Sequence, residues 1–263
     1  MTDALNRRCE IGEYSLWLID DPESNLTSRE RSFLMPQVVE VARKGFGSES
    51  IPESDIYLHA IEVKHGAYVF RDSRLLAFTS GVSIESSQGL VAYLEGTAIL
   101  PEAQGRGIYD VLIGVRLLWL SAAEPAFVAT RTANPIVAKK LLEIDPYPFS
   151  SESLKYQTLA VELAQIIFRD FSDHRAPGGP HFEVAPGVFR MAYESAMNSS
   201  TPISGSEWLD DWFEGHLETD EGDAVLIVGE YQKEFARNLV RKGIERIGGT
   251  SDDAWSVISS FIA

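Results

Sequence analysis

Three consecutive β-type runs, followed by a glycine-containing loop and a helical pattern, constrain this chain more than any other feature. The runs span residues 67–71, 74–84 and 90–100, and turn-forming residues separate them. Because short turns of this chemistry connect neighbouring strands, the runs predict an antiparallel meander. After the loop at 101–107, apolar residues recur at helical spacing through 108–119. This spacing predicts a helix that packs one apolar stripe on the sheet.

The segments on either side extend the same pattern. Residues 13–19 read as a strand, and residues 28–44 read as a helix that Pro36 kinks or restarts. A strand at 126–132 and a helix at 136–144 follow the central helix. A strand, a crossover helix and a second strand usually form a right-handed parallel pair. The sequence therefore predicts an α/β fold with a mixed sheet.

The pattern changes after Pro146 and Pro148, so we place a boundary between residues 1–156 and 157–263. In the second part we expect helices at 157–171 and 206–217, strands at 188–193 and 224–230, and a helix-rich segment from 231 onward. The late strands could continue the sheet of the first part. The added segment could also form a lid over an acceptor or a dimer surface, and a homodimer is left open.

Composition excludes several classes of protein. The chain has 23 lysine and arginine residues against 39 aspartate and glutamate residues, a formal charge of −16, and its basic residues are scattered. Nucleic acid is therefore not an expected partner. A single cysteine, Cys9, fits a reducing compartment, and no run is apolar and long enough for a signal peptide or a membrane span. We expect a soluble, cytoplasmic protein, and the histidine spacing indicates no metal site.

The segment Leu100-Pro101-Glu102-Ala103-Gln104-Gly105-Arg106-Gly107-Ile108 is the candidate anion-binding site. Glycine lets the backbone approach a ligand, and the unpaired N–H groups and the dipole of the following helix attract negative charge. Phosphate is the expected ligand. The segment lacks the Gly-Lys-Ser/Thr ending of a P-loop, and Asp110 stands where a dinucleotide-binding loop has its third glycine.

This segment resembles the pyrophosphate loop of the GCN5-related N-acetyltransferases, whose pattern is Gln/Arg-x-x-Gly-x-Gly/Ala. Gln104, Gly107 and Tyr109 stand at its three defined positions, and Tyr109 replaces the usual small residue. Residues 93–100 resemble the fourth strand of that family, and residues 130–135 resemble its fifth strand and the turn that follows. The resemblance covers roughly residues 13–144.

The resemblance implies the acyl-CoA N-acyltransferase fold of this family, with residues 1–156 as the acetyl-CoA-binding domain and residues 157–263 as an additional C-terminal α/β extension. It implies that the diphosphate of acetyl-CoA lies on the loop amides and that the pantetheine arm inserts between the fourth and fifth strands. The cofactor-binding residues implied are Ile99, Leu100, Gln104, Gly105, Arg106, Gly107, Ile108, Tyr109 and Asn134. Asn134 could also cap the helix that follows it, and the two roles are compatible.

The implied reaction is direct transfer of an acetyl or short acyl group to a primary amine in a ternary complex, without a covalent enzyme intermediate. Strand alternation puts Tyr93 and Glu95 on one face, and Glu95 is our first choice of general base. Alternatively, Glu95 is a strand residue that faces water. Leu141 stands where the family has the tyrosine that protonates the thiolate. Its substitute would be solvent, since a thiol has a pKa of about 8.5, or one of Tyr109, Tyr147 and Tyr156.

The acceptor we prefer is a small-molecule amine. Surplus carboxylates attract cations over long range, which favours a cationic acceptor. Three alternatives stay open: an acetyltransferase that acts on a protein amine, a non-catalytic acyl-CoA-binding regulatory module, and a nucleotide-binding enzyme that uses the same loop.

Overall fold

The computed structural model describes residues 6–150, 154–169, 181–184, 187–190 and 202–259. The chain forms two compact units, each assembled from separate stretches of sequence. The first unit comprises Met1–Ser83, Leu94–Glu124 and Gln232–Ala263, and the second comprises Ile84–Tyr93 and Pro125–Tyr231. This division differs from the expected boundary after residue 156, because the last segment of the chain packs with the first unit.

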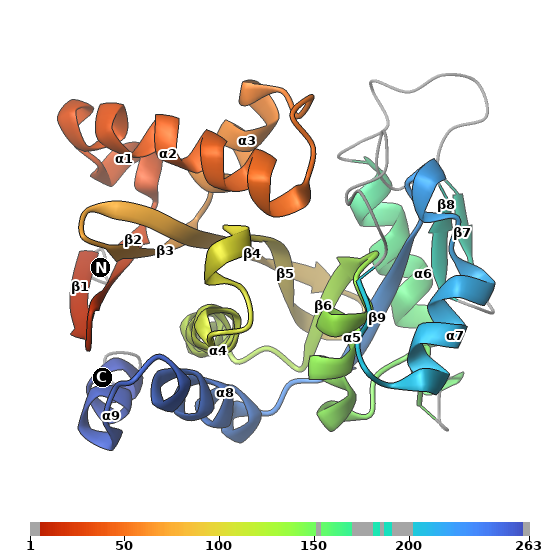
Figure 1. The fold of residues 1–263 in the computed structure, drawn as a ribbon. Helices are drawn as coiled ribbons and strands as arrows, with labels where there is room; N and C mark the ends of the chain where they lie inside the picture. Colours follow the sequence, from red (N-terminus) through yellow and green to blue (C-terminus); the bar gives the residue numbers. More distant parts are fainter. Residues whose placement is uncertain (1–5, 151–153, 170–180, 185–186, 191–201, 260–263) are drawn as a thin grey trace. The chain divides into compact units, whose positions relative to one another are not determined.

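A sheet forms the centre of the first unit (Figure 1). In spatial order its strands are β1 (Asn6–Ile11), β2 (Tyr14–Asp20), β3 (His65–Arg71), β4 (Arg74–Ser86) and the Leu94–Ile99 part of β5 (Gly89–Ile99). The pairs β1–β2, β2–β3 and β3–β4 are antiparallel. Asp72 and Ser73 join β3 to β4 with φ values of 50° and 66°, which suit a tight two-residue hairpin turn.

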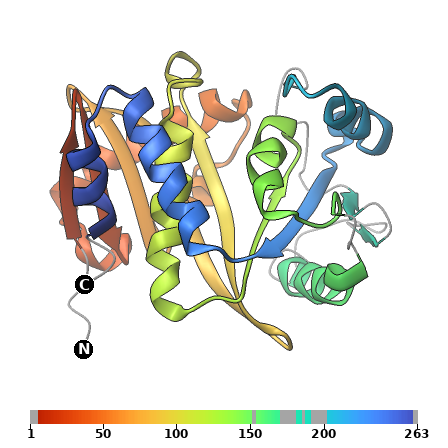
Figure 2. The same ribbon diagram turned by 90° about the horizontal axis from the view of Figure 1, so that it is seen from below.

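Helices cover both faces of this sheet (Figures 1 and 2). On one face lie α1 (Pro22–Asn25), α2 (Ser28–Phe46) and α3 (Glu53–Ala60). On the other face lie α4 (Ile108–Leu120), α8 (Lys233–Arg246) and α9 (Ser251–Ser259). The helix α2 continues through Pro36 without the restart that we considered, and it ends at Gly47, whose φ is 64°.

Helix α4 is buried on all sides rather than along one stripe. Every residue of the helix except Tyr109 is buried. The sheet covers one side, and α8 packs so closely on another that a Cβ at Gly114 would lie 2.7 Å from the carbonyl oxygen of Ala236. The one arginine of α4, Arg116, donates through Nη1 to the carbonyl oxygens of Ser80 and Gly96. An all-round apolar helix needs such double cover.

The second unit is built on β6 (Phe127–Thr132), β9 (Ala224–Glu230), β8 (Val188–Arg190) and β7 (His181–Glu183), in this spatial order, with the Gly89–Tyr93 part of β5 on the other side of β6. The pairs β6–β9, β8–β9 and β7–β8 are antiparallel. Its helices are α5 (Pro135–Leu141), α6 (Leu154–Arg169) and α7 (Glu207–His216). The late strand β9 thus extends the sheet that contains β6.

The predicted α/β class is confirmed by these elements. Two predicted elements extend beyond the described residues. They are the helix at 157–171, at its residues 170–171, and the strand at 188–193, at its residues 191–193. Within the part of the chain that the structure describes, no helix has the length and apolar character needed to span a bilayer.

Candidate functional site

The loop between β5 and α4 is shaped by two glycines in the left-handed region. A short 3-10 helix, Pro101–Ala103, follows the end of β5. After it come Gly105, with a φ of 74°, and Gly107, with a φ of 97°. Only glycine adopts such angles without strain, so the sequence fixes this local path. Gly107 is the N-cap of α4, and no side chain caps the helix there. The first turn of α4 therefore has no side-chain cap of its own.

The main-chain N–H groups from Gly105 to Tyr109 have no acceptor among the described residues. The next bond along the chain runs from the Val111 N–H to the Gly107 carbonyl oxygen, at 3.2 Å. Open N–H groups at the N-terminus of a helix carry partial positive charge and bind anions, phosphate groups among them. Arg106, which is exposed, adds a full positive charge beside them. This stretch can hold a diphosphate.

Four of the other implied cofactor residues have structural roles in the same unit. The side-chain amide of Gln104 donates to the Ile99 carbonyl oxygen at 3.1 Å, which ties the loop to the end of β5. Leu100 is buried, and its N–H donates to the Leu76 carbonyl oxygen at 2.9 Å. Ile108 is buried as well. The hydrogen bonds of Gln104 and Leu100 connect the loop to β5 and β4.

Glu95 lies on β5 next to a residue that the sequence did not single out. Its Oε1 is 3.5 Å from Nδ1 of His59, near the end of α3. The side chains are 27% and 41% exposed, so the pair is partly shielded and still open to solvent. Nothing in the local sequence marks His59, because its partner Glu95 lies 36 positions further along the chain. A carboxylate paired with an imidazole can accept and hold a proton.

Tyr93 and Asn134 belong to the second unit. Tyr93 is buried and precedes Glu95 by two positions on β5, so the two residues share a face of that strand. The side chain of Asn134 accepts a hydrogen bond from the Ile136 N–H at 2.9 Å, which makes Asn134 the N-cap of α5. The capping role considered for Asn134 is therefore present.

The candidate tyrosines differ in their surroundings. Tyr109 is half-buried, and burial raises the pKa of its phenol. Burial also raises the pKa of Tyr147 to about 12, and its hydroxyl donates to the Val184 carbonyl oxygen. Tyr156 is buried against Phe127, with ring centroids 6.4 Å apart. Leu141, at the position of the family's tyrosine, is buried.

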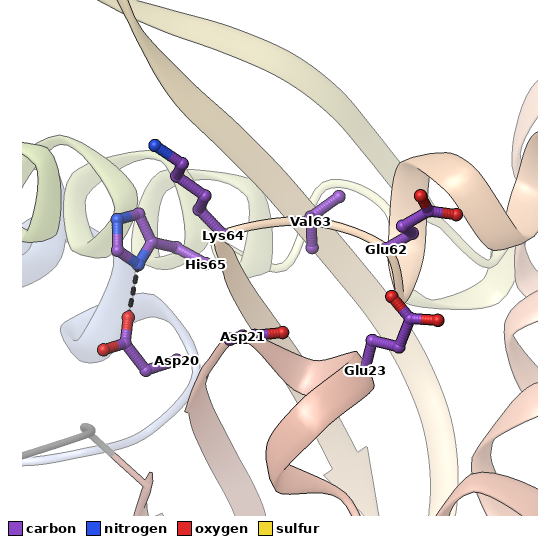
Figure 3. Close-up of a pocket in the computed structure, with 7 residues that line it drawn as sticks. All are labelled: Asp20, Asp21, Glu23, Glu62, Val63, Lys64 and His65. Atoms are coloured by element: carbon purple, nitrogen blue, oxygen red, sulfur yellow. Dashed lines mark hydrogen bonds and ion pairs between the residues drawn. The ribbon is translucent and has the colours of Figure 1, made fainter.

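The first unit also has an acidic hollow of about 410 Å³, shown in Figure 3. Its lining residues are Asp20, Asp21, Glu23, Glu62, Val63, Lys64 and His65. None of the residues expected to bind the cofactor or to act in catalysis lines it. Asp20 Oδ1 lies 2.6 Å from His65 Nδ1, and the His65 ring packs against Trp119 with centroids 4.8 Å apart. Among the described residues, no group of three or more His, Cys, Asp or Glu side chains could hold a metal ion.

His65 should make the stability of the protein sensitive to acid. Burial lowers its pKa below the ordinary value of 6.5, although Asp20 partly opposes this shift. As the pH falls below 6.5, the unfolded chain therefore takes up this proton more readily than the folded one, and the free energy of unfolding decreases. In His65→Gln we expect a smaller drop in Tm between about pH 7.5 and 5.5 than in the wild type. The exposed His216, changed to Gln, should keep the wild-type drop; equal drops in all three proteins would contradict the prediction.

Comparisons with known proteins give matches among solved structures alone: no protein-family model and no curated protein matches the chain. The aminoglycoside N-acetyltransferase AAC(6')-Iy in complex with CoA is 15% identical, with 49% of this chain and 85% of that chain covered, at a TM-score of 0.36. Tetrahymena GCN5 is 8% identical, with 79% and 91% covered, at a TM-score of 0.40. The ribosomal-protein-S18-alanine N-acetyltransferase from Escherichia coli is 11% identical, with 82% and 94% covered, at a TM-score of 0.38. Two of these similar structures are thus named as N-acetyltransferases, one for a small-molecule acceptor and one for a protein acceptor.

Proposed function

We propose that this protein is an N-acetyltransferase of the GCN5-related type, which binds acetyl-CoA or another short acyl-CoA and transfers the acyl group to a primary amine. The observation that carries the proposal is the row of open N–H groups from Gly105 to Tyr109, directly after β5 and at the N-terminus of α4. Gln104 and Gly107 stand at the spacing of the family's pyrophosphate loop.

The chain's own residues fit the diphosphate of coenzyme A. The N–H groups of the loop would donate to its oxygens, and Arg106 would add a charge-assisted contact. A Cβ at Gly105 would meet no heavy atom within 4 Å, so a ligand has room to approach the backbone there. Ile99, Leu100, Tyr109 and Asn134 complete the proposed cofactor-binding set. When bound, acetyl-CoA supplies the thioester whose acyl group is transferred.

Glu95 is the proposed general base, with Tyr93 beside it on the same face of β5. An amine must lose its ammonium proton before it can attack a carbonyl carbon, and a partly shielded carboxylate can accept that proton. Nδ1 of His59 lies 3.5 Å from the carboxylate oxygen and would help to orient the carboxylate.

Tyr147 is a poor substitute for the tyrosine that Leu141 replaces, since its hydroxyl already donates to the Val184 carbonyl oxygen. Solvent can protonate the departing thiolate, because the conjugate thiol has a pKa of about 8.5. The reaction therefore needs no dedicated acid.

The proposed acceptor is a small-molecule primary amine. The formal charge of −16 draws cationic molecules toward the protein and raises the rate of encounter. A protein amine is the alternative acceptor, and competition between a small amine and a peptide amine at equal concentration separates the two.

A second candidate is a non-catalytic acyl-CoA-binding module. The buried Leu141 in place of a tyrosine, together with the engaged hydroxyl of Tyr147, favours it. Such a module would bind acetyl-CoA without turnover.

The test of the proposal combines two measurements on the full chain. Calorimetry should show saturable binding of acetyl-CoA, and thiol release should rise when a panel of primary amines is added. Binding with no thiol release for any amine supports the non-catalytic module. If acetyl-CoA does not bind, both candidates are wrong.

A further inference from the structure

Helix α8, from the end of the chain, packs directly against the candidate diphosphate loop. A Cβ at Gly107 would lie 2.6 Å from the Cβ of Arg246 and 2.8 Å from the Gly243 carbonyl oxygen. Conversely, a Cβ at Gly243 would lie 2.7 Å from the Val111 nitrogen and 2.8 Å from the Gly107 carbonyl oxygen. Glycine at both positions lets the two backbones approach this closely. The path of the loop is therefore set in part by α8.

The same contact contains an ion pair whose carboxylate is buried. Asp110, in the first turn of α4, is 2% exposed at its side chain, and its Oδ2 lies 2.8 Å from Nη1 of Arg246. The Arg246 side chain is 55% exposed. Since Gly243 and Arg246 are three positions apart, they lie on one face of α8, which is the face turned to the loop.

A carboxylate in this turn has two opposite effects. It stabilises α4, because a negative charge near a helix N-terminus interacts favourably with the dipole. It also repels a second anion on the N–H groups of the same turn, and burial weakens the screening of that repulsion by water. A cation at 2.8 Å cancels most of the field of Asp110 at the loop.

We propose that Arg246 is a positioning and charge-compensating residue of the anion loop, so that binding of the coenzyme A diphosphate depends on α8. This inference rests on the proposed function, because it takes the diphosphate as the ligand. It assigns a role in cofactor binding to a helix more than 120 residues beyond the loop in sequence. The ion pair does not need to contact the ligand to have this effect.

The test measures the Kd of coenzyme A and of S-acetylpantetheine, which lacks the diphosphate, by calorimetry on the full chain. In Arg246→Ala, the Kd of coenzyme A should rise about tenfold, because an uncompensated carboxylate then faces the diphosphate. Arg246→Lys keeps the charge and should stay within about threefold of the wild type. In each variant, the Kd of S-acetylpantetheine should stay at the wild-type value.

Asp110→Asn gives a prediction of opposite sign. Removing the carboxylate leaves Arg246 uncompensated, so coenzyme A should bind more tightly than to the wild type, which loss of packing alone would not produce. The double variant Asp110→Asn/Arg246→Ala should regain most of the affinity lost in Arg246→Ala. Arg241→Ala is the matched control: it removes an arginine of α8 whose partner, Glu234, lies on the same helix at 3.2 Å. It should leave the Kd unchanged.

Two results would overturn the inference. One is a Kd of coenzyme A for Asp110→Asn that equals or exceeds the wild-type Kd. This Kd can be measured even if Arg246→Ala does not fold. The other is an equal loss of affinity for coenzyme A and S-acetylpantetheine. Failure of the wild type to bind coenzyme A would instead overturn the proposed function, so the two failures are distinguishable.

Discussion

Replacing Glu95 with glutamine is expected to lower kcat for acetyl transfer by about 10²- to 10⁴-fold, the usual range for loss of a general base. The amide has the size of the carboxylate and cannot accept a proton from the acceptor ammonium. The Kd of acetyl-CoA should not change, because the diphosphate loop is left intact. Steady-state thiol release and calorimetry on the same samples check both statements.

The pH profile separates a base from a packing role. For a general base, we expect the wild-type pH profile to have an acidic limb that is absent from the residual activity of Glu95→Gln.

Glu85→Gln provides the control for Glu95→Gln. It makes the same change of charge at an exposed position of β4 and should keep the wild-type kcat. If Glu95→Gln matches the wild type at every pH, Glu95 has no part in the reaction.

The second large effect is expected for Gly107→Ala. Alanine is strained at φ 97°, at a cost of about 1–3 kcal/mol. Its Cβ also meets Arg246 at 2.6 Å and the Gly243 carbonyl oxygen at 2.8 Å, and such overpacking costs about 1–3 kcal/mol more. The free energy of unfolding should therefore fall by about 2–6 kcal/mol. Calorimetry should detect no binding of acetyl-CoA, because the loop can relieve the contact only by moving.

Gly105→Ala is the matched variant in the same loop. Its φ of 74° imposes strain as well, but no heavy atom lies within 4 Å of the added Cβ. We expect a loss of about 1–3 kcal/mol from strain alone, measured by chemical denaturation. Equal losses in the two variants would show that the contact between the loop and α8 is unimportant.

Local patterns in the sequence predicted much of the fold. Turn residues such as Asp72 and Ser73 located the hairpin between β3 and β4, and the bounds of β9 match the predicted strand. The glycines at 105 and 107 located the loop, because the positive φ angles found there favour glycine over other residues. Each of these features depends on a few residues that are neighbours in the sequence.

Features that depend on distant partners were not predictable in this way. β1 was not predicted, because this edge strand pairs with β2 alone and exposes Arg7, Arg8 and Glu10, so its sequence shows no run of apolar residues. The proximity of His59 to Glu95 requires α3 to pack against β5, across a long separation in sequence. The two residues of the ion pair between Asp110 and Arg246 are even farther apart in the sequence. Composition and periodicity contain no signal for such pairings.

The discontinuous first unit has a consequence for how the chain matures during synthesis. Helix α4 leaves the ribosome long before α8, which buries one of its sides. At about 5–20 residues per second, an apolar helix stays uncovered for roughly 6–25 seconds. A nascent chain in that state is a natural client for a chaperone. A polypeptide stopped at Tyr231 would keep that exposed surface permanently, so we expect it in the insoluble fraction of cells in which the full chain is recovered in solution.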